Sequence, residues 1–248
     1  MNLTVERSQE RNHQEYKLSL AKAVFLHLFP GAIIMTVFMI VAYLARGSEL
    51  PPVFWFTIAV PFTLVPTELG VLLYLGHKRN GRFSLEGIVV NRQPLQWQQY
   101  LWMIPLTFVS VIVLATLTGS ADPTIYKQLF GWWPAWLNIS VVDENWTKPV
   151  VIITYLLFSG IVGPWVEELY FRGYLLPRLS RFGHWGVLLN ATLFALYHFW
   201  SPWHLISRIF STLPFALAAQ YGSLNVAIIT HILVNTVGLI LTILPLVI

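Results

Sequence analysis

Three short clusters in the second half of the chain combine residue types that can do chemistry. The first is the run Glu167-Glu168-Leu169-Tyr170-Phe171-Arg172, the second places His198 four residues after Phe194, and the third places Asn235 four residues after His231. A carboxylate with a histidine can orient and deprotonate water, and a histidine with an asparagine amide can donate hydrogen bonds to an oxyanion. Together they indicate hydrolysis of an amide without a nucleophilic serine.

The spacing within the first cluster separates its two acids. Glu168 and Arg172 are four residues apart with the acid first, which is the favoured order for an ion pair on one face of a helix. Glu167 points about 100° away from Glu168 around the helix axis, so the two carboxylates can have different roles. The alternatives are a structural ion pair for Glu168 and Arg172, and a counter-ion or proton-relay role for Glu167.

A metal site is a second interpretation of the same residues. His198, His231 and Glu167 would supply two imidazoles and a carboxylate, which is a known ligand set for catalytic zinc. The chain has no cysteine and lacks the His-Glu-x-x-His, Gly-x-Ser-Gly and Gly-x-Gly-Asp motifs that mark zinc, serine and aspartyl proteases of membranes. Each histidine alone would be typical of a hydrogen bond between membrane helices. We expect neither a metal nor a cofactor.

The composition indicates the elements that must position these side chains. Of 248 residues, 56% are hydrophobic and only 10% are charged, which is typical of a chain folded in a bilayer. We therefore predict an all-α, polytopic transmembrane bundle of seven to eight spans, with 1–248 as a single domain, a cytoplasmic tail over 1–21 and the catalytic helices over about 150–247. The predicted spans are 22–45, 53–76, 101–118, 150–178, 184–200, 204–220 and 224–247.

The predicted helices bring the clusters to a similar depth. The fourth and fifth spans form a hairpin that turns near 181–184, and Glu167 and His198 each lie roughly 21 Å from that turn along antiparallel helices. His231 lies about 10 Å into the last span, counted from the same side. A charge within a span costs at least about 2.5–3.5 kcal/mol, so clustered ionisable residues there indicate function. We expect all of them to face one cavity that opens to the cytoplasm.

Basic residues predict the orientation of the bundle. They gather in the amino-terminal tail, the second loop and the fourth loop, which we place in the cytoplasm together with the amino terminus. The long third loop carries Trp132, Trp133, Trp136 and Trp146 and is expected along the outer interface. The net charge of +4 is therefore read as an orientation signal, with membrane lipids and no nucleic acid as partners.

Five further residues of the spans are interpreted without a catalytic role. Glu68 and His27 stand isolated in the sequence, and Glu68 follows Pro66, where the backbone is already loosened. His204 and Arg208 share a face near the outer end of the sixth span, which predicts a surface pair or a contact with lipid headgroups. Phe194 is expected to pack the fifth helix against the fourth.

The three clusters, in this order on successive helices, closely resemble the signature of the CAAX protease and bacteriocin-processing family. That family includes Ras-converting prenyl endopeptidases and bacterial Abi proteins. The matching motifs are Glu167-Glu168-xxx-Arg172, Phe194-xxx-His198 and His231-xxx-Asn235, within roughly residues 150–237. Each motif alone is weakly specific, whereas three in order are strongly specific.

The resemblance implies a role for each matched residue. Glu167 would be the general base that activates water, with His198 assisting, and Glu168 and Arg172 would support the site. The residues that match the family's oxyanion donors are His231 and Asn235. The implied mechanism is metal-free.

The resulting hypothesis is an intramembrane glutamate-dependent endopeptidase. Its substrate would be a prenylated CAAX-type tail or another membrane-associated peptide. Two other classes stay open on the sequence: a proton-coupled transporter that uses the same acids and histidines as a relay, and a non-catalytic scaffold or immunity protein. Inverted repeats would favour the transporter, and the sequence shows none.

Overall fold

The structure, a computed structural model, describes residues 17–91 and 95–248. Over these residues the chain is helical and contains no strand, which confirms the predicted all-α class. The basic residues of the tail at Arg7 and Arg11, and Arg92 of the second loop, lie outside the described residues.

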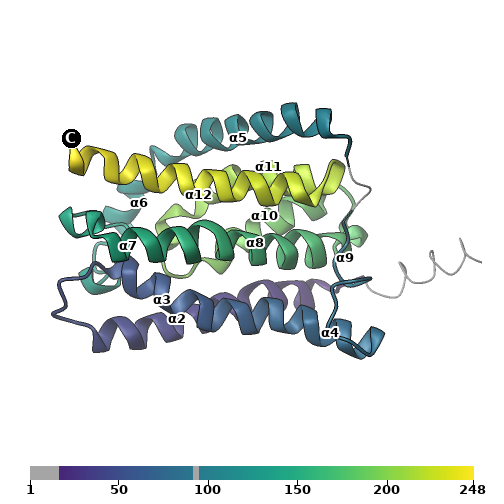
Figure 1. Ribbon diagram of the computed structural model, residues 1–248, viewed down its shortest axis with the longest axis horizontal. Helices are drawn as coiled ribbons and strands as arrows, with labels where there is room; N and C mark the ends of the chain where they lie inside the picture. Colours follow the sequence, from purple (N-terminus) through teal and green to yellow (C-terminus); the bar gives the residue numbers. More distant parts are fainter. Residues whose placement is uncertain (1–16, 92–94) are drawn as a thin grey trace, which may run out of the picture.

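Long helices run side by side along the length of the molecule, with α2 and α3 on one flank and α5 on the other (Figure 1). In chain order the elements are α2 (Leu20–Leu44), α3 (Pro52–Leu64), η1 (Val65–Leu69), α4 (Gly70–Asn80), α5 (Trp97–Gly119), α6 (Asp122–Leu129), η2 (Ala135–Leu137), η3 (Glu144–Thr147), α7 (Pro149–Thr154), η4 (Tyr155–Val162), α8 (Gly163–Glu167), η5 (Glu168–Leu175), α9 (Leu176–Arg178), η6 (Ser180–Phe182), α10 (Trp185–Tyr197), η7 (Pro202–His204), α11 (Leu205–Tyr221) and α12 (Leu224–Val247).

Every predicted span corresponds to a helical segment, but the segments differ in length. Five are long and apolar enough to cross a membrane: Leu20–Leu44, Pro52–Asn80, Trp97–Gly119, Pro149–Arg178 and Leu224–Val247. The third span, predicted to be short, extends to 23 residues because its helix begins at Trp97. The fifth ends earlier than predicted, since α10 has 13 residues, and α11 has 17.

The fourth span departs from the regular α-helix that the sequence analysis assumed. It alternates between α-helical turns and two π-helical segments, Tyr155–Val162 and Glu168–Leu175. The second span also contains a π-helical turn at Val65–Leu69, which begins just before Pro66. The wider π turn is uncommon and recurs at functional sites, where it re-aims side chains. Glu68, Glu168 and Arg172 all lie on such turns.

Close packing of α2 against the end of α10 fixes the position of the segment that leads into His198. Gly31 of α2 is buried, and a Cβ atom added there would overlap the carbonyl oxygen of Tyr197. Tyr197 itself is fully buried and contacts the rings of Phe194 and Trp200. The missing side chain of Gly31 therefore allows the two backbones to meet.

Replacing Gly31 with alanine should destabilise the protein. The added methyl group must displace α2 or Tyr197, and overpacking of this kind costs about 1–3 kcal/mol, whereas alanine otherwise favours a helix by up to about 1 kcal/mol. We expect the thermal unfolding midpoint in detergent to fall for Gly31→Ala. The matched control is Gly238→Ala in α12, where a Cβ meets no atom within 4 Å. Equal midpoints for the two variants would contradict this account of the packing.

Candidate active site

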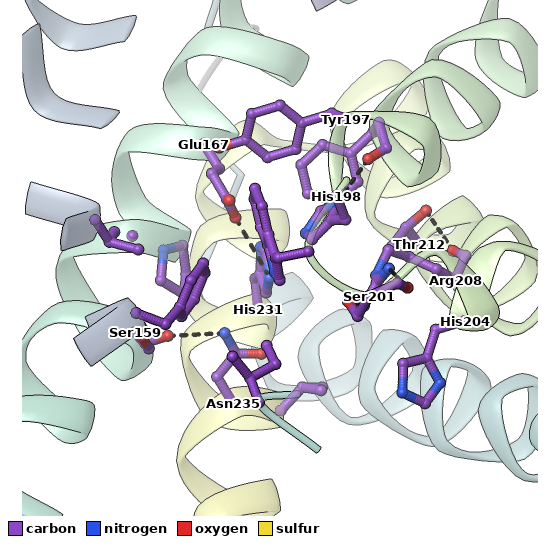
Figure 2. Close-up of a pocket in the computed structure, with 18 of the residues that line it drawn as sticks. Ser159, Glu167, Tyr197, His198, Ser201, His204, Arg208, Thr212, His231 and Asn235 are labelled. Atoms are coloured by element: carbon purple, nitrogen blue, oxygen red, sulfur yellow. Dashed lines mark hydrogen bonds and ion pairs between the residues drawn. The ribbon is translucent and has the colours of Figure 1, made fainter. Parts of the chain in front are cut away.

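The predicted clusters meet around one cavity. Glu167 from α8, His198 from the end of α10, and His231 and Asn235 from α12 all line a cavity of about 330 Å³ (Figure 2). This volume is at the lower end of the range for ligand sites in proteins. The polar groups of these four residues, from the fourth, fifth and seventh predicted spans, therefore face one space.

Glu168 and Arg172 lie behind the cavity wall rather than in it. Arg172 Nη1 donates to Glu168 Oε1 at 3.0 Å, and neither side chain is exposed. The guanidinium carbon of Arg172 also lies 3.9 Å from the ring centroid of Phe194, so this phenylalanine covers a cation as well as packing two helices together. A buried charge is tolerated when it is paired in this way.

His231 connects the buried pair to the cavity. Its Nδ1 atom lies 2.8 Å from Glu168 Oε1, and its Nε2 atom lies 4.0 Å from Glu167 Oε2. Because a carboxylate can only accept, Nδ1 carries a proton. Nε2 is then an acceptor when the ring is neutral and a donor only when the ring is an imidazolium.

His198 is held differently, at the point where α10 ends. Its Nδ1 atom lies 2.7 Å from the carbonyl oxygen of Phe194, so Nδ1 donates this hydrogen bond. The residue is the carboxyl-terminal cap of α10, with φ −82° and ψ 60°, and not part of a continuous helix as predicted. The neutral ring therefore presents Nε2 as an acceptor.

Asn235 is fixed by the π-helical segment of the fourth span. Its Nδ2 atom donates to the carbonyl oxygen of Ser159 at 2.9 Å. A side-chain amide carries two N–H groups. One of them is used by Ser159, which leaves the other for a ligand in the cavity.

Two residues left out of the predicted site lie next to it. Tyr197 lines the cavity and donates from its hydroxyl group to Glu68 Oε1 at 2.9 Å, and Glu68 is fully buried and close enough to Glu167 for their charges to interact. The signal was an acidic residue within a span, which indicates function by default. His27 is structural instead, since its ring contacts Ala23 O at 2.7 Å and Asn190 Nδ2 at 3.1 Å.

The prediction of a surface pair between His204 and Arg208 was wrong. His204 Nδ1 lies 2.7 Å from Asp122 Oδ2, while Arg208 donates to the carbonyl oxygen and Oγ of Ser201 at 3.3 and 3.0 Å. Both residues line the cavity, as Figure 2 shows. Spacing placed them on one helical face, but η7 ends at His204, before α11 begins.

The cavity extends toward the third-loop end of the bundle. Its lining includes Ile139, Ser140 and Trp146 of that loop, whereas Arg178 lies at the other end of the fourth span. We predicted that the third loop lies along the outer interface of the membrane and that the cavity opens to the cytoplasm. Because this loop lines the cavity, the two predictions do not fit together. Which end faces the cytoplasm stays a prediction.

The residues proposed as zinc ligands do not form a metal cluster. Among the residues that the structure describes, no group of three or more histidine, aspartate or glutamate side chains is arranged to hold a metal ion. His231 directs Nδ1 to Glu168, and His198 directs Nδ1 to a backbone carbonyl. In both histidines, therefore, Nε2 is the ring nitrogen that these two hydrogen bonds do not use.

The site and fold define an all-helical protein with an acid, two histidines and an amide around a cavity between apolar helices. Residues 149–237 match the family described as Type II CAAX prenyl endopeptidase Rce1-like. This confirms the resemblance carried by the three motifs, and it indicates a protease of the multi-pass membrane type. A search of curated proteins and a search of solved structures gave no match.

Removing one member of the buried ion pair should be worse than removing both. Arg172→Met leaves the Glu168 carboxylate buried without its main partner, and breaking a buried pair costs about 3–5 kcal/mol. The double variant Glu168→Gln/Arg172→Met removes both charges and should regain much of this loss. Unfolding of the single and double variants in detergent, compared as a double-mutant cycle, measures the coupling. Strictly additive losses would show that the two side chains do not stabilise each other.

Proposed function

We propose that this protein is an intramembrane glutamate-dependent endopeptidase. The observation that carries the proposal is the convergence of Glu167, His198, His231 and Asn235 on one cavity, with an ion pair buried behind them. Similarity to the prenyl endopeptidase family over residues 149–237 supports a peptide bond as the target.

Glu167 would activate the attacking water. The 4.0 Å gap between Glu167 Oε2 and His231 Nε2 fits one water molecule that donates a hydrogen bond of about 2.8 Å to each atom. With both hydrogens donated, the water directs a lone pair at the scissile carbonyl carbon. The carboxylate takes the proton as the carbon–oxygen bond forms.

Asn235 would stabilise the oxyanion, and the two histidines would assist. The second N–H of Asn235 is available to the oxygen that becomes negative, and a fixed donor in a dry site is strongly stabilising. His231 accepts from the water when its ring is neutral, and it could donate to the oxyanion only in the imidazolium form, because its Nδ1–H is committed to Glu168. His198 would accept a hydrogen bond through Nε2 and so orient the substrate or the water.

Collapse of the tetrahedral intermediate breaks the carbon–nitrogen bond. The proton taken by Glu167 passes to the leaving amine, which departs as the new amino terminus, and the carbonyl carbon keeps the hydroxyl group as a carboxylic acid. The acid then gives its proton to the released amine, which leaves a carboxylate and an ammonium group. One water is consumed and no covalent enzyme intermediate forms. Glu167 returns to its starting state.

The proposed substrate is a peptide presented at the membrane. The matching family is named for its prenyl CAAX endopeptidases, so a prenylated tail is the first substrate to be tested. Apolar side chains that include Val60, Leu64 and Phe215 line the cavity and would accept aliphatic residues of such a tail. An unprenylated counterpart tests whether the lipid contributes.

Loss of the carboxylate should abolish cleavage while the fold survives. Glu167→Gln is close in shape and cannot take a proton from water, and general-base catalysis contributes about 10²–10⁴-fold, so we expect kcat/KM to fall by at least that order. His198→Ala should reduce cleavage through loss of orientation. The measurement is release of a quenched fluorophore from a farnesylated tail peptide by purified protein in detergent.

The same assay tests whether cleavage requires a metal, and it separates a protease from a transporter or a scaffold. Activity that persists after treatment with a chelator supports the metal-free mechanism, whereas loss restored by zinc would overturn it. Wild-type cleavage retained in Glu167→Gln would remove the proposed base from the mechanism. A transporter or scaffold would give no cleavage with either protein.

A further inference from the structure

Arg208 is a cation inside the cavity that the proposed chemistry does not use. It lies on α11, lines the same cavity as Glu167 and His231, and is half-buried. The loop that follows His198 holds it, because both of its hydrogen bonds go to Ser201, which is three residues after that histidine. Its position is therefore tied to the site.

The guanidinium of Arg208 forms no ion pair with any carboxylate of the described residues. Glu167 and Asp122 are acids whose charges act on Arg208, and Asp122 already accepts from His204 at 2.7 Å and from Ser207 at 2.6 Å. A guanidinium has five N–H donors, and Ser201 takes two of them. Donors of Arg208 are thus left for a ligand.

A cation with unused donors in an apolar bundle is costly, and its preferred partner is chemically specific. A charge inside a membrane protein marks a ligand or substrate site by default, and arginine binds carboxylates through a planar fork of parallel hydrogen bonds. The carboxylate of Glu167 lies in the wall of the same cavity, on the other side of His198 from Arg208 (Figure 2). A peptide that places its carbonyl at Glu167 and a carboxylate at Arg208 would satisfy both residues.

We propose that Arg208 binds the terminal carboxylate of the peptide substrate and so selects chain ends over internal segments. The inference rests on the proposed function, because it names the substrate class of that site. The cavity volume of about 330 Å³ fits a short chain end and not a folded domain. Phe56, Val60 and Leu64 along the wall would hold the apolar residues that precede the carboxylate.

The test compares three quenched peptides that differ only at their carboxyl end. One has a free carboxylate, one has a carboxamide, and one has a carboxamide with aspartate as its last residue, which separates a terminal carboxylate from an acidic side chain. A hydrogen bond between charged groups is worth roughly 1.5–3 kcal/mol, so wild type should prefer the free acid by about 10–100-fold in kcat/KM. The aspartyl amide should resemble the plain amide.

Arg208→Gln should remove the preference, so that the ratio of free acid to amide falls to about one, and Arg208→Lys should restore part of it. Arg181→Gln is the matched control, since this exposed arginine at the fourth loop should leave the ratio as in wild type. A purely structural role for Arg208 would slow both peptides equally and overturn the proposal. Equal cleavage of acid and amide by wild type would also overturn it.

A binding measurement keeps this inference separate from the proposed function. The dissociation constants of the free-acid and amide peptides are measured for wild type and for Arg208→Gln by fluorescence anisotropy. Preferential binding of the acid that is lost in Arg208→Gln supports the carboxylate site even if no peptide is cleaved, in which case the proposed function fails alone. Equal affinities in wild type overturn the inference whatever the cleavage result.

Discussion

The buried hydrogen-bonded chain from Arg172 through Glu168 to His231 is the interaction on which the site depends. Its three members come from the fourth span and from α12, so a cation, an anion and an imidazole join the two helices away from solvent. Charges in such surroundings persist only when each is paired, and removal of one leaves the others uncompensated. The pairing also fixes which nitrogen of His231 carries a proton. Stability and catalytic geometry are therefore set by the same bonds.

Irregular backbone segments position the side chains of the site in a way that a regular α-helix would not. The π-helical turns of the fourth span lie on both sides of Glu167: one supplies the Ser159 carbonyl to Asn235, and the other carries Glu168 and Arg172. The end of α10 at Tyr197 lets His198 turn back to the Phe194 carbonyl. His198, His231 and Asn235 thus each have a hydrogen bond that orients the side chain toward the cavity, and fixed orientation of this kind is what a preorganised site requires.

Residue types and helical spacing predicted the residues of the site but only one of their pairings. The pair of Glu168 and Arg172 followed from the four-residue rule, and the shared depth of Glu167 and His198 followed from counting residues to a turn. Hydropathy located each helical segment. The spacing of residues did not assign Glu68 to the site, because its contact with Tyr197 joins positions 129 residues apart along the chain. Regular helical periodicity also paired Arg208 with His204 at the surface. This was wrong because the helix is broken before α11, which changes the neighbours of both residues.

The charged side chains in the cavity wall make the cavity electrostatically asymmetric. Glu167 is the carboxylate of the described residues that lines the cavity, and Arg208 lies on the other side of His198 from it, toward His204 (Figure 2). His204 and Ser140 of the third loop have side-chain atoms 3.5 Å apart. Water screens little between such groups when apolar helices enclose them, so the field along the cavity would orient a polar ligand before any bond is made. A peptide with a negative end would enter in one direction only. The distance between Glu167 and Arg208 would then determine which peptide bond, counted from the carboxyl end, lies at Glu167. The helices that carry the two residues would fix that distance.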